Sequence, residues 1–355
     1  MFWYIFIFLV IASTLFLSYQ YKFDRKTSVT VRSLLFILLV LFIGLRHEVG
    51  GDWFGYLDWF RRVSSGGLTL SFEDIFLKDF GYNLFNWLSS KIGWGIYGVN
   101  LLCASIFLIG LFAFLDYLGN DRGFYLGLLV SYPYLIMVVA NGYTRQSVAI
   151  GLIMLSYSLF LKERYMSSFL CQMLAFFFHK TSAIGFIIFL FHRKTLKWIL
   201  PLILAILAIA FSFFGQLFVR YYALYVENPM YSEGGTIRAV MNLVPALIFI
   251  VLFRYFERRY PDSKFWLIIS VIVLILSIPS ILKFTFADRL LLYFSMIQPL
   301  VFVRLEYVLK EIEVKAMLFI SIIFVYCLAM TVWLLFAKHA PYWIPYKNLI
   351  LKLLE

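Results

Sequence analysis

The sequence predicts an all-α fold, that of a polytopic integral membrane protein with about twelve transmembrane or half-membrane helices. Two observations lead to this class. Of the 355 residues, 63% are hydrophobic and only 14% are charged. The apolar residues also gather in long runs that short polar connectors separate. Because backbone exposed to lipid must satisfy its hydrogen bonds internally, such runs are expected to be helices.

Two of the apolar segments are ambiguous. Segments 166–179 and 180–191 are each too short to cross a bilayer alone, since a span needs about 20 residues. They form either two short elements that meet at His179 or one span with a polar break there. The full set of expected segments is 2–20, 29–46, 96–118, 123–140, 145–161, 166–179, 180–191, 197–214, 238–255, 265–283, 289–304 and 315–336.

Basic residues mark the connectors at 21–28, 162–165, 192–197, 254–264 and 304–315. They fall on one side only if 166–179 and 180–191 are two short elements, and the positive-inside rule makes that side cytoplasmic. We therefore expect 1–355 to be a single polytopic membrane domain. Both termini and the longer loops 47–95 and 215–237 would face the extracytoplasmic side. The net charge of +12 reflects these anchors and does not indicate nucleic acid binding.

The stretch 141–161 holds the first candidate site. A polar turn precedes Arg145 and Gln146, which open the helix expected at 145–161. A helix start offers unpaired N–H groups and the positive end of the macrodipole. Together with the guanidinium of Arg145, it is a plausible anion receptor. The alternative is an arginine that only reaches back to the lipid headgroups.

Other polar groups, distinct from the basic residues of the connectors, are expected at the same outer face. Each also has a structural explanation, as a helix cap, an ion-pair partner or an interfacial anchor; Asp288, for example, is a plausible N-cap of the 289–304 helix. Jointly, three guanidiniums with a histidine and an aspartate suit a multiply charged anion such as a diphosphate. The groups are Arg46, Asp52 with Tyr56, His179, and Asp288 with Arg289.

At these residues the chain resembles the EpsG/Wzy-type polysaccharide polymerases of bacterial envelopes. Each matching motif is short, and the specificity lies in their order and spacing between about residues 40 and 295 of a polytopic chain. The motifs are Gly44-Leu45-Arg46, Gly51-Asp52 with Tyr56, Arg145-Gln146 with Ala149, Phe178-His179-Lys180-Thr181-Ser182-Ala183, and Asp288-Arg289 with Tyr293.

The resemblance implies a multi-pass glycosyltransferase of the bacterial inner (cytoplasmic) membrane, with its active site and the longer loops facing the periplasm. It would join oligosaccharide repeat units carried on undecaprenyl diphosphate into O-antigen or a related polysaccharide, without a nucleotide sugar, a cofactor or a metal. Its expected partners are that lipid-linked oligosaccharide, membrane lipids, and a chain-length regulator and flippase of the same pathway.

The resemblance and the residue chemistry together give a mechanism. We expect Arg145 and Arg289 to hold the diphosphate, with Arg46 assisting. His179 ranks above Asp52 as the base, because pairing with an arginine would lower the pKa of Asp52. The remaining expected substrate-binding residues are Gln146, Asp288 and Tyr56.

Three other functions remain open from the sequence. A lipid-linked oligosaccharide flippase would place its cations along a central path, whereas this chain concentrates them near one face. A membrane O-acyltransferase would cut an acyl donor and leave polymer length unchanged. An O-antigen ligase uses the same donor but transfers the polymer to lipid A–core, and only the resemblance separates it from a polymerase.

Overall fold

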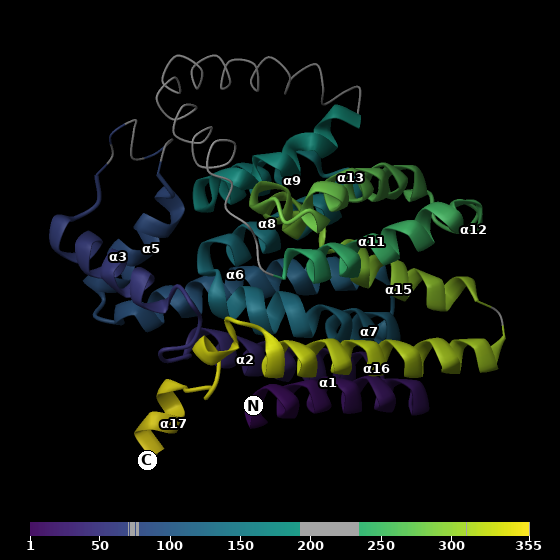
Figure 1. Ribbon diagram of the computed structural model, residues 1–355, viewed down its shortest axis with the longest axis horizontal. Coiled ribbons are helices and arrows are strands. Elements are labelled where there is room, and N and C mark those ends of the chain that lie inside the picture. Colours follow the sequence, from purple (N-terminus) through teal and green to yellow (C-terminus); the bar gives the residue numbers. More distant parts are fainter. Residues whose placement is uncertain (70, 72–74, 76–77, 192–233, 310, 355) are drawn as a thin grey trace.

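The computed structural model describes residues 1–69, 71, 75, 78–191, 234–309 and 311–354 (Figure 1). Within these ranges every regular element is a helix. In chain order they are α1 (Phe2–Gln20), α2 (Arg25–Gly44), α3 (Trp53–Gly66), α5 (Phe80–Lys91), α6 (Gly95–Leu118), α7 (Asp121–Ser131), η1 (Tyr132–Ala140), α8 (Thr144–Leu161), α9 (Tyr165–Phe178), η2 (Lys180–Phe191), α11 (Gly235–Val251), α12 (Phe253–Glu257), α13 (Ser263–Ile281), α14 (Thr285–Leu291), η4 (Leu292–Phe294), α15 (Ile297–Val308), α16 (Ile312–Phe336), η5 (Ala340–Tyr342) and α17 (Leu349–Leu354).

The all-α polytopic class is confirmed. Seven described helices are long and apolar enough to cross a membrane, and the pair formed by α14–η4 and α15, bent by 41°, would be an eighth. Helices α9, η2 and α11 are apolar but shorter. Most predicted segments coincide with one element within a few residues, but 123–140 is divided between α7 and η1, and 238–255 between α11 and α12. The single helix predicted at 289–304 is wrong, because the chain there is divided among α14, η4 and α15 with a bend of 41°. Segment 197–214 lies outside the described residues.

The ambiguous segments form two short elements. The Nε2 of Gln172 on α9 donates to the backbone oxygen of Ser182 on η2 at 2.8 Å. The ring centroids of Phe169 and Phe186 lie 5.8 Å apart, so η2 returns antiparallel along α9. His179 lies at the tip of this hairpin, and the interpretation as two elements that meet there is confirmed.

The basic connectors that are described gather at one end of the bundle, around the α6–α7 turn. The contacts that show this are Ser28 Oγ to Asp121 Oδ1 at 2.5 Å, Tyr117 Oη to Asp262 Oδ2 at 2.5 Å, Arg304 Nη2 to Asp262 Oδ2 at 2.6 Å, and Lys162 Nζ at 5.9 Å from the ring centroid of Tyr117. The connector 192–197 lies outside the described residues. The cytoplasmic orientation of this end stays a prediction.

Both termini lie at the opposite end, as expected (Figure 1). The hydroxyl of Tyr4 donates to the backbone oxygen of Trp343 at 3.0 Å, and the amide of Gly50 donates to that of Tyr342 at 2.8 Å. The expected loop 47–95 contributes α3 and α5 here.

The helix that carries Arg145 is held against α6 by a close approach of two backbones. A Cβ built on Gly110 of α6 would lie 1.9 Å from the carbonyl oxygen of Gly151 on α8. Small residues permit such contact between membrane helices, where van der Waals packing drives association. This packing fixes the position of α8 along the bundle axis and therefore the position of its first turn.

Candidate functional site

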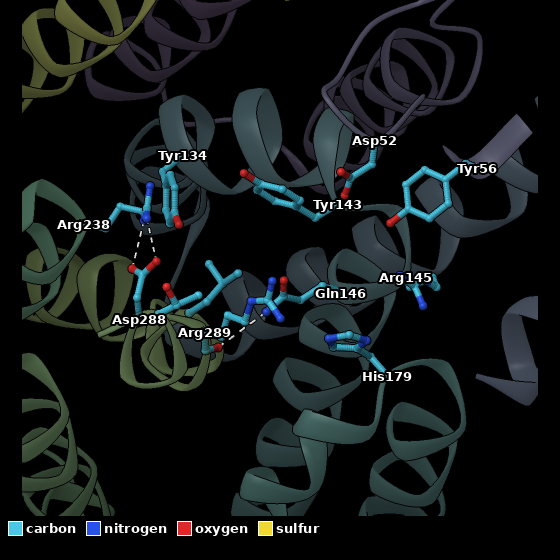
Figure 2. A pocket seen from close by; sticks show the side chains of 12 residues that line it. Asp52, Tyr56, Tyr134, Tyr143, Arg145, Gln146, His179, Arg238, Asp288 and Arg289 are labelled. Atoms are coloured by element: carbon cyan, nitrogen blue, oxygen red, sulfur yellow. Dashed lines mark hydrogen bonds and ion pairs between the residues drawn. The ribbon is translucent and has the colours of Figure 1, made fainter. Parts of the chain in front are cut away.

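A cavity of about 260 Å³ opens at the end of the bundle where the termini lie (Figure 2). Its size is near the lower end of small-molecule sites, which begin at about 300 Å³. Helices α3, η1, α8, α11 and α14 and the α9–η2 tip supply its walls. The lining residues are Asp52, Tyr56, Tyr134, Tyr143, Arg145, Gln146, His179, Arg238, Thr285, Asp288, Arg289 and Leu292.

Seven of the eight predicted site residues line this cavity, although they are distant from one another in the sequence. The exception is Arg46. Arg145 lies in the first turn of α8, which begins at Thr144, as predicted. Its Nη1 donates to Asp79 Oδ2, and its guanidinium carbon lies 4.5 Å from the ring centroid of Trp59 and 5.6 Å from that of Tyr56. An ion pair and two aromatic faces therefore hold the guanidinium at the cavity, so it does not extend to the lipid headgroups.

Asp79, the residue before α5, also faces the histidine. Its Oδ2 lies 3.6 Å from Nδ1 of His179, and this nitrogen has no hydrogen-bond partner within the described residues. Burial alone would raise the pKa of Asp79, but interaction with His179 and then Arg145 outweighs it and holds that pKa below its ordinary value. Because Nδ1 is turned to Asp79, Nε2 is the nitrogen that the ring offers to a ligand in the cavity.

Asp52 precedes α3 and makes no side-chain cap. Its carboxylate reaches the cavity, and within the described chain no ion pair forms with it. Burial by the surrounding protein raises the pKa of Asp52, against the opposing charges of Arg145, Arg289 and His339. The expectation that an arginine lowers this pKa is therefore wrong, because the nearby cations do not compensate for lost hydration.

The α11–α14 side of the cavity carries an ion pair that sequence reasoning missed. Arg238 donates from Nε to Asp288 Oδ1 at 2.9 Å and from Nη2 to Oδ2 at 2.5 Å. Asp288 is thus not an N-cap, which corrects the prediction: α14 begins at Thr285, with Phe284 at the N-cap position. Arg289 lies in the last turn of α14 and is exposed to the cavity, not at a helix start.

Arg46 occupies a different place from the one expected of a diphosphate ligand. It is 1% exposed. Its Nη1 donates to the backbone oxygen of Ile43 at 2.9 Å, and Nη2 donates to Thr144 Oγ1 at 2.6 Å and Asn100 Oδ1 at 3.2 Å. It therefore caps α2 and ties that helix to the start of α8, one residue before Arg145.

The cavity still contains three guanidiniums, as predicted, but the third belongs to Arg238 and not to Arg46. A signal for Arg238 was present, because it opens an apolar segment as Arg145 does. Asp79 had no such signal among the acids of a long loop. Tyr134 and Tyr143 were also missed, because Tyr134 reaches the wall from a π-helical turn, which residue spacing does not predict.

The EpsG family model matches residues 29–348, a region that contains every lining residue of the cavity. No match was found among curated proteins or among solved structures.

Proposed function

The chain belongs to the EpsG family, and from this premise we propose that it is a cell-envelope polysaccharide polymerase. It joins undecaprenyl-diphosphate-linked oligosaccharide repeat units at the periplasmic face of the inner membrane, as a glycosyltransferase. Family membership suggests a polymerase-like role. The observation that carries the specific reaction is a single cavity that combines three arginines with His179.

In this proposal Arg145 and Arg289 bind the leaving diphosphate. Arg289 is exposed on the cavity wall, and Gln146 Nε2 lies 3.5 Å from its backbone oxygen, which links α8 to α14. Arg145 is fixed by Asp79 before substrate arrives. Guanidinium forks match phosphate oxygens, and donors already in place stabilise the charge on the leaving group without reorganisation.

His179 is the proposed base. A hydroxyl of the incoming unit attacks the anomeric carbon of the growing chain; a new C–O bond forms while the bond to the diphosphate oxygen breaks and its electron pair leaves with the diphosphate. The hydroxyl proton moves to Nε2 of His179. Asp79 holds the ring through Nδ1 and stabilises the imidazolium, which makes it a positioning residue. Asp52 orients the attacking hydroxyl.

Deletion of the gene, followed by electrophoresis of the lipopolysaccharide, tests the proposal. Loss of a polymerase leaves core with a single repeat unit, and the plasmid-borne gene restores the ladder. Bare core alone would identify a ligase, and an unchanged ladder would reject both transfer reactions. Accumulation of the lipid-linked unit on the cytoplasmic side only would indicate a flippase.

A further inference from the structure

One end of the cavity has no part in the mechanism above. Figure 2 shows Arg238, Asp288 and Tyr134 together at this end, with Arg145, His179 and Tyr56 at the other. Tyr143 lies along the wall between the two ends. We call Arg238, Asp288 and Tyr134, together with the neighbouring Tyr143, the α11 end of the cavity.

The ion pair at the α11 end differs in its setting from a comparable pair elsewhere. The side chains of Arg238 and Asp288 are 20% and 10% exposed and line the cavity. Arg304 and Asp262 also form a buried pair, at 2.6 Å with side chains 3% and 12% exposed, but they lie among the basic connectors. Of these two pairs, Arg238–Asp288 lines the cavity and Arg304–Asp262 does not.

The chemistry of the α11 end suits a neutral ligand. The charges of Arg238 and Asp288 compensate each other. The carboxylate of Asp288 lines the cavity, unlike that of Asp79, which pairs with Arg145, and it would therefore repel a phosphate. Charged donors and acceptors still form strong hydrogen bonds with hydroxyl groups. The rings of Tyr134 and Tyr143 provide apolar faces against which C–H groups can pack. Hydroxyls around a ring with C–H faces describe a sugar.

The α11 end is also held in place. Nδ2 of Asn242 donates to the backbone oxygen of Arg238 at 3.1 Å, and its Oδ1 accepts from Gln298 Nε2 at 2.9 Å. Tyr326 donates its hydroxyl to Gln298 Oε1 at 2.8 Å. This buried chain joins α11 to α15 and α16. A site whose supporting groups are themselves hydrogen-bonded keeps its geometry.

We propose that the α11 end is a subsite for a sugar ring of the oligosaccharide, separate from the end that binds diphosphate. The proposal rests on the function proposed above and adds to it. The oligosaccharide is recognised by Arg238, Asp288 and the two tyrosines, while the lipid diphosphate is recognised by Arg145 and Arg289. The two ends therefore select different parts of one substrate.

Direct binding to the purified full-length protein in lipid nanodiscs separates the two ends. The probes are the neutral repeat-unit oligosaccharide released from its carrier, and undecaprenyl diphosphate without sugar. The double variant Arg238→Gln/Asp288→Asn removes both charges together and so leaves no unpaired buried charge. It should bind the oligosaccharide about tenfold more weakly or worse, and undecaprenyl diphosphate within about twofold. Arg289→Gln should show the reverse pattern.

The matched control is Arg304→Gln/Asp262→Asn, which removes a buried pair outside the cavity and should change neither binding constant. Tyr134→Phe should retain oligosaccharide binding, and Tyr134→Leu should lose it. An equal loss for both probes, no loss, or the same loss in the control would overturn the subsite. A wild-type protein that binds the oligosaccharide but forms no polymer would refute the proposed function alone. Polymer formation with unchanged binding in the double variant would refute the subsite alone.

Discussion

The carboxylate of Asp79 and the imidazole of His179 face each other, with Oδ2 3.6 Å from Nδ1. The same oxygen accepts the hydrogen bond from Arg145. One acid from the loop before α5 thus positions both the proposed base and the proposed diphosphate ligand. This arrangement couples the two chemical roles to a single buried residue, 7% exposed.

Replacing Asp79 should therefore impair catalysis more than binding. In Asp79→Asn the amide can donate to Nδ1 and so favour the tautomer whose Nε2 carries a proton and cannot accept another. With a purified lipid-linked repeat unit, we expect turnover to fall about 10²–10⁴-fold, the usual general-base contribution. The turnover of His179→Gln should fall by a similar factor.

Asp58→Asn is the matched control, because Asp58 lies on the neighbouring helix α3 and, among the residues that the structure describes, pairs only with exposed Arg61, at 3.2 Å. Its turnover should equal that of the wild type. Near-normal turnover in His179→Gln, with a collapse in Asp52→Asn, would transfer the role of base to Asp52.

Lysine substitutions test the diphosphate ligands. Arg145→Lys and Arg289→Lys keep the positive charge but lose the fork that binds two oxygens. Losing one such donor typically costs about 10²–10³ in rate, so polymer should be largely lost at normal protein abundance. Arg61→Lys, on exposed surface, should have no effect. Wild-type ladders in both variants would disprove the role, and failure through low abundance alone would make the two arginines structural.

Much of the site could be predicted from the sequence, because arginines in a chain this apolar are costly and need a reason to be there. Arg145 and His179 were identified from their places at a helix start and a helix break. The sequence could not show which of Arg46 and Arg238 lines the cavity, because each lies at a boundary of an apolar segment. Only tertiary contacts distinguish an arginine that caps a helix from one that lines a cavity. The place of Asp79 in the site could not be predicted, because it depends on how the 47–95 loop folds back, and hydrophobic periodicity does not indicate this.

Labelling of single cysteines tests the orientation. In a background without Cys103, Cys171 and Cys327, a membrane-impermeant thiol reagent should label Asp58→Cys in intact cells. It should label Arg258→Cys, in a basic connector at the opposite end, only after permeabilisation. The positive-inside rule predicts this orientation of the protein in the membrane. Labelling of position 258 in intact cells, with protection of position 58, would invert the topology and place the cavity on the cytoplasmic side.

Asp52 gives a pH-dependent prediction with a definite sign. The surrounding protein raises its pKa, so the ionised carboxylate destabilises the folded protein at pH 7, and this cost disappears as the pH falls below the ordinary pKa of about 3.9. Because Asp52 is an exposed residue, solvent screens most of the cost. Asp52→Asn should therefore raise the melting temperature at pH 7 only slightly while it lowers turnover. The stability gain should shrink as the pH is lowered through the raised pKa. A melting temperature that falls at pH 7 would show that the carboxylate has a stabilising partner.

Arg46 should behave as a structural residue, in contrast to the cavity arginines. Arg46→Gln removes the charge from buried hydrogen bonds that join α2 to α6 and α8. Since each hydrogen bond to a charged group contributes about 1.5–3 kcal/mol, we expect a loss of at least about 3 kcal/mol in stability and reduced abundance. Turnover per folded molecule should stay within a few-fold of the wild type, because the guanidinium does not reach the cavity. Normal thermal stability combined with a loss of turnover as large as that of Arg289→Lys would instead return Arg46 to the diphosphate site.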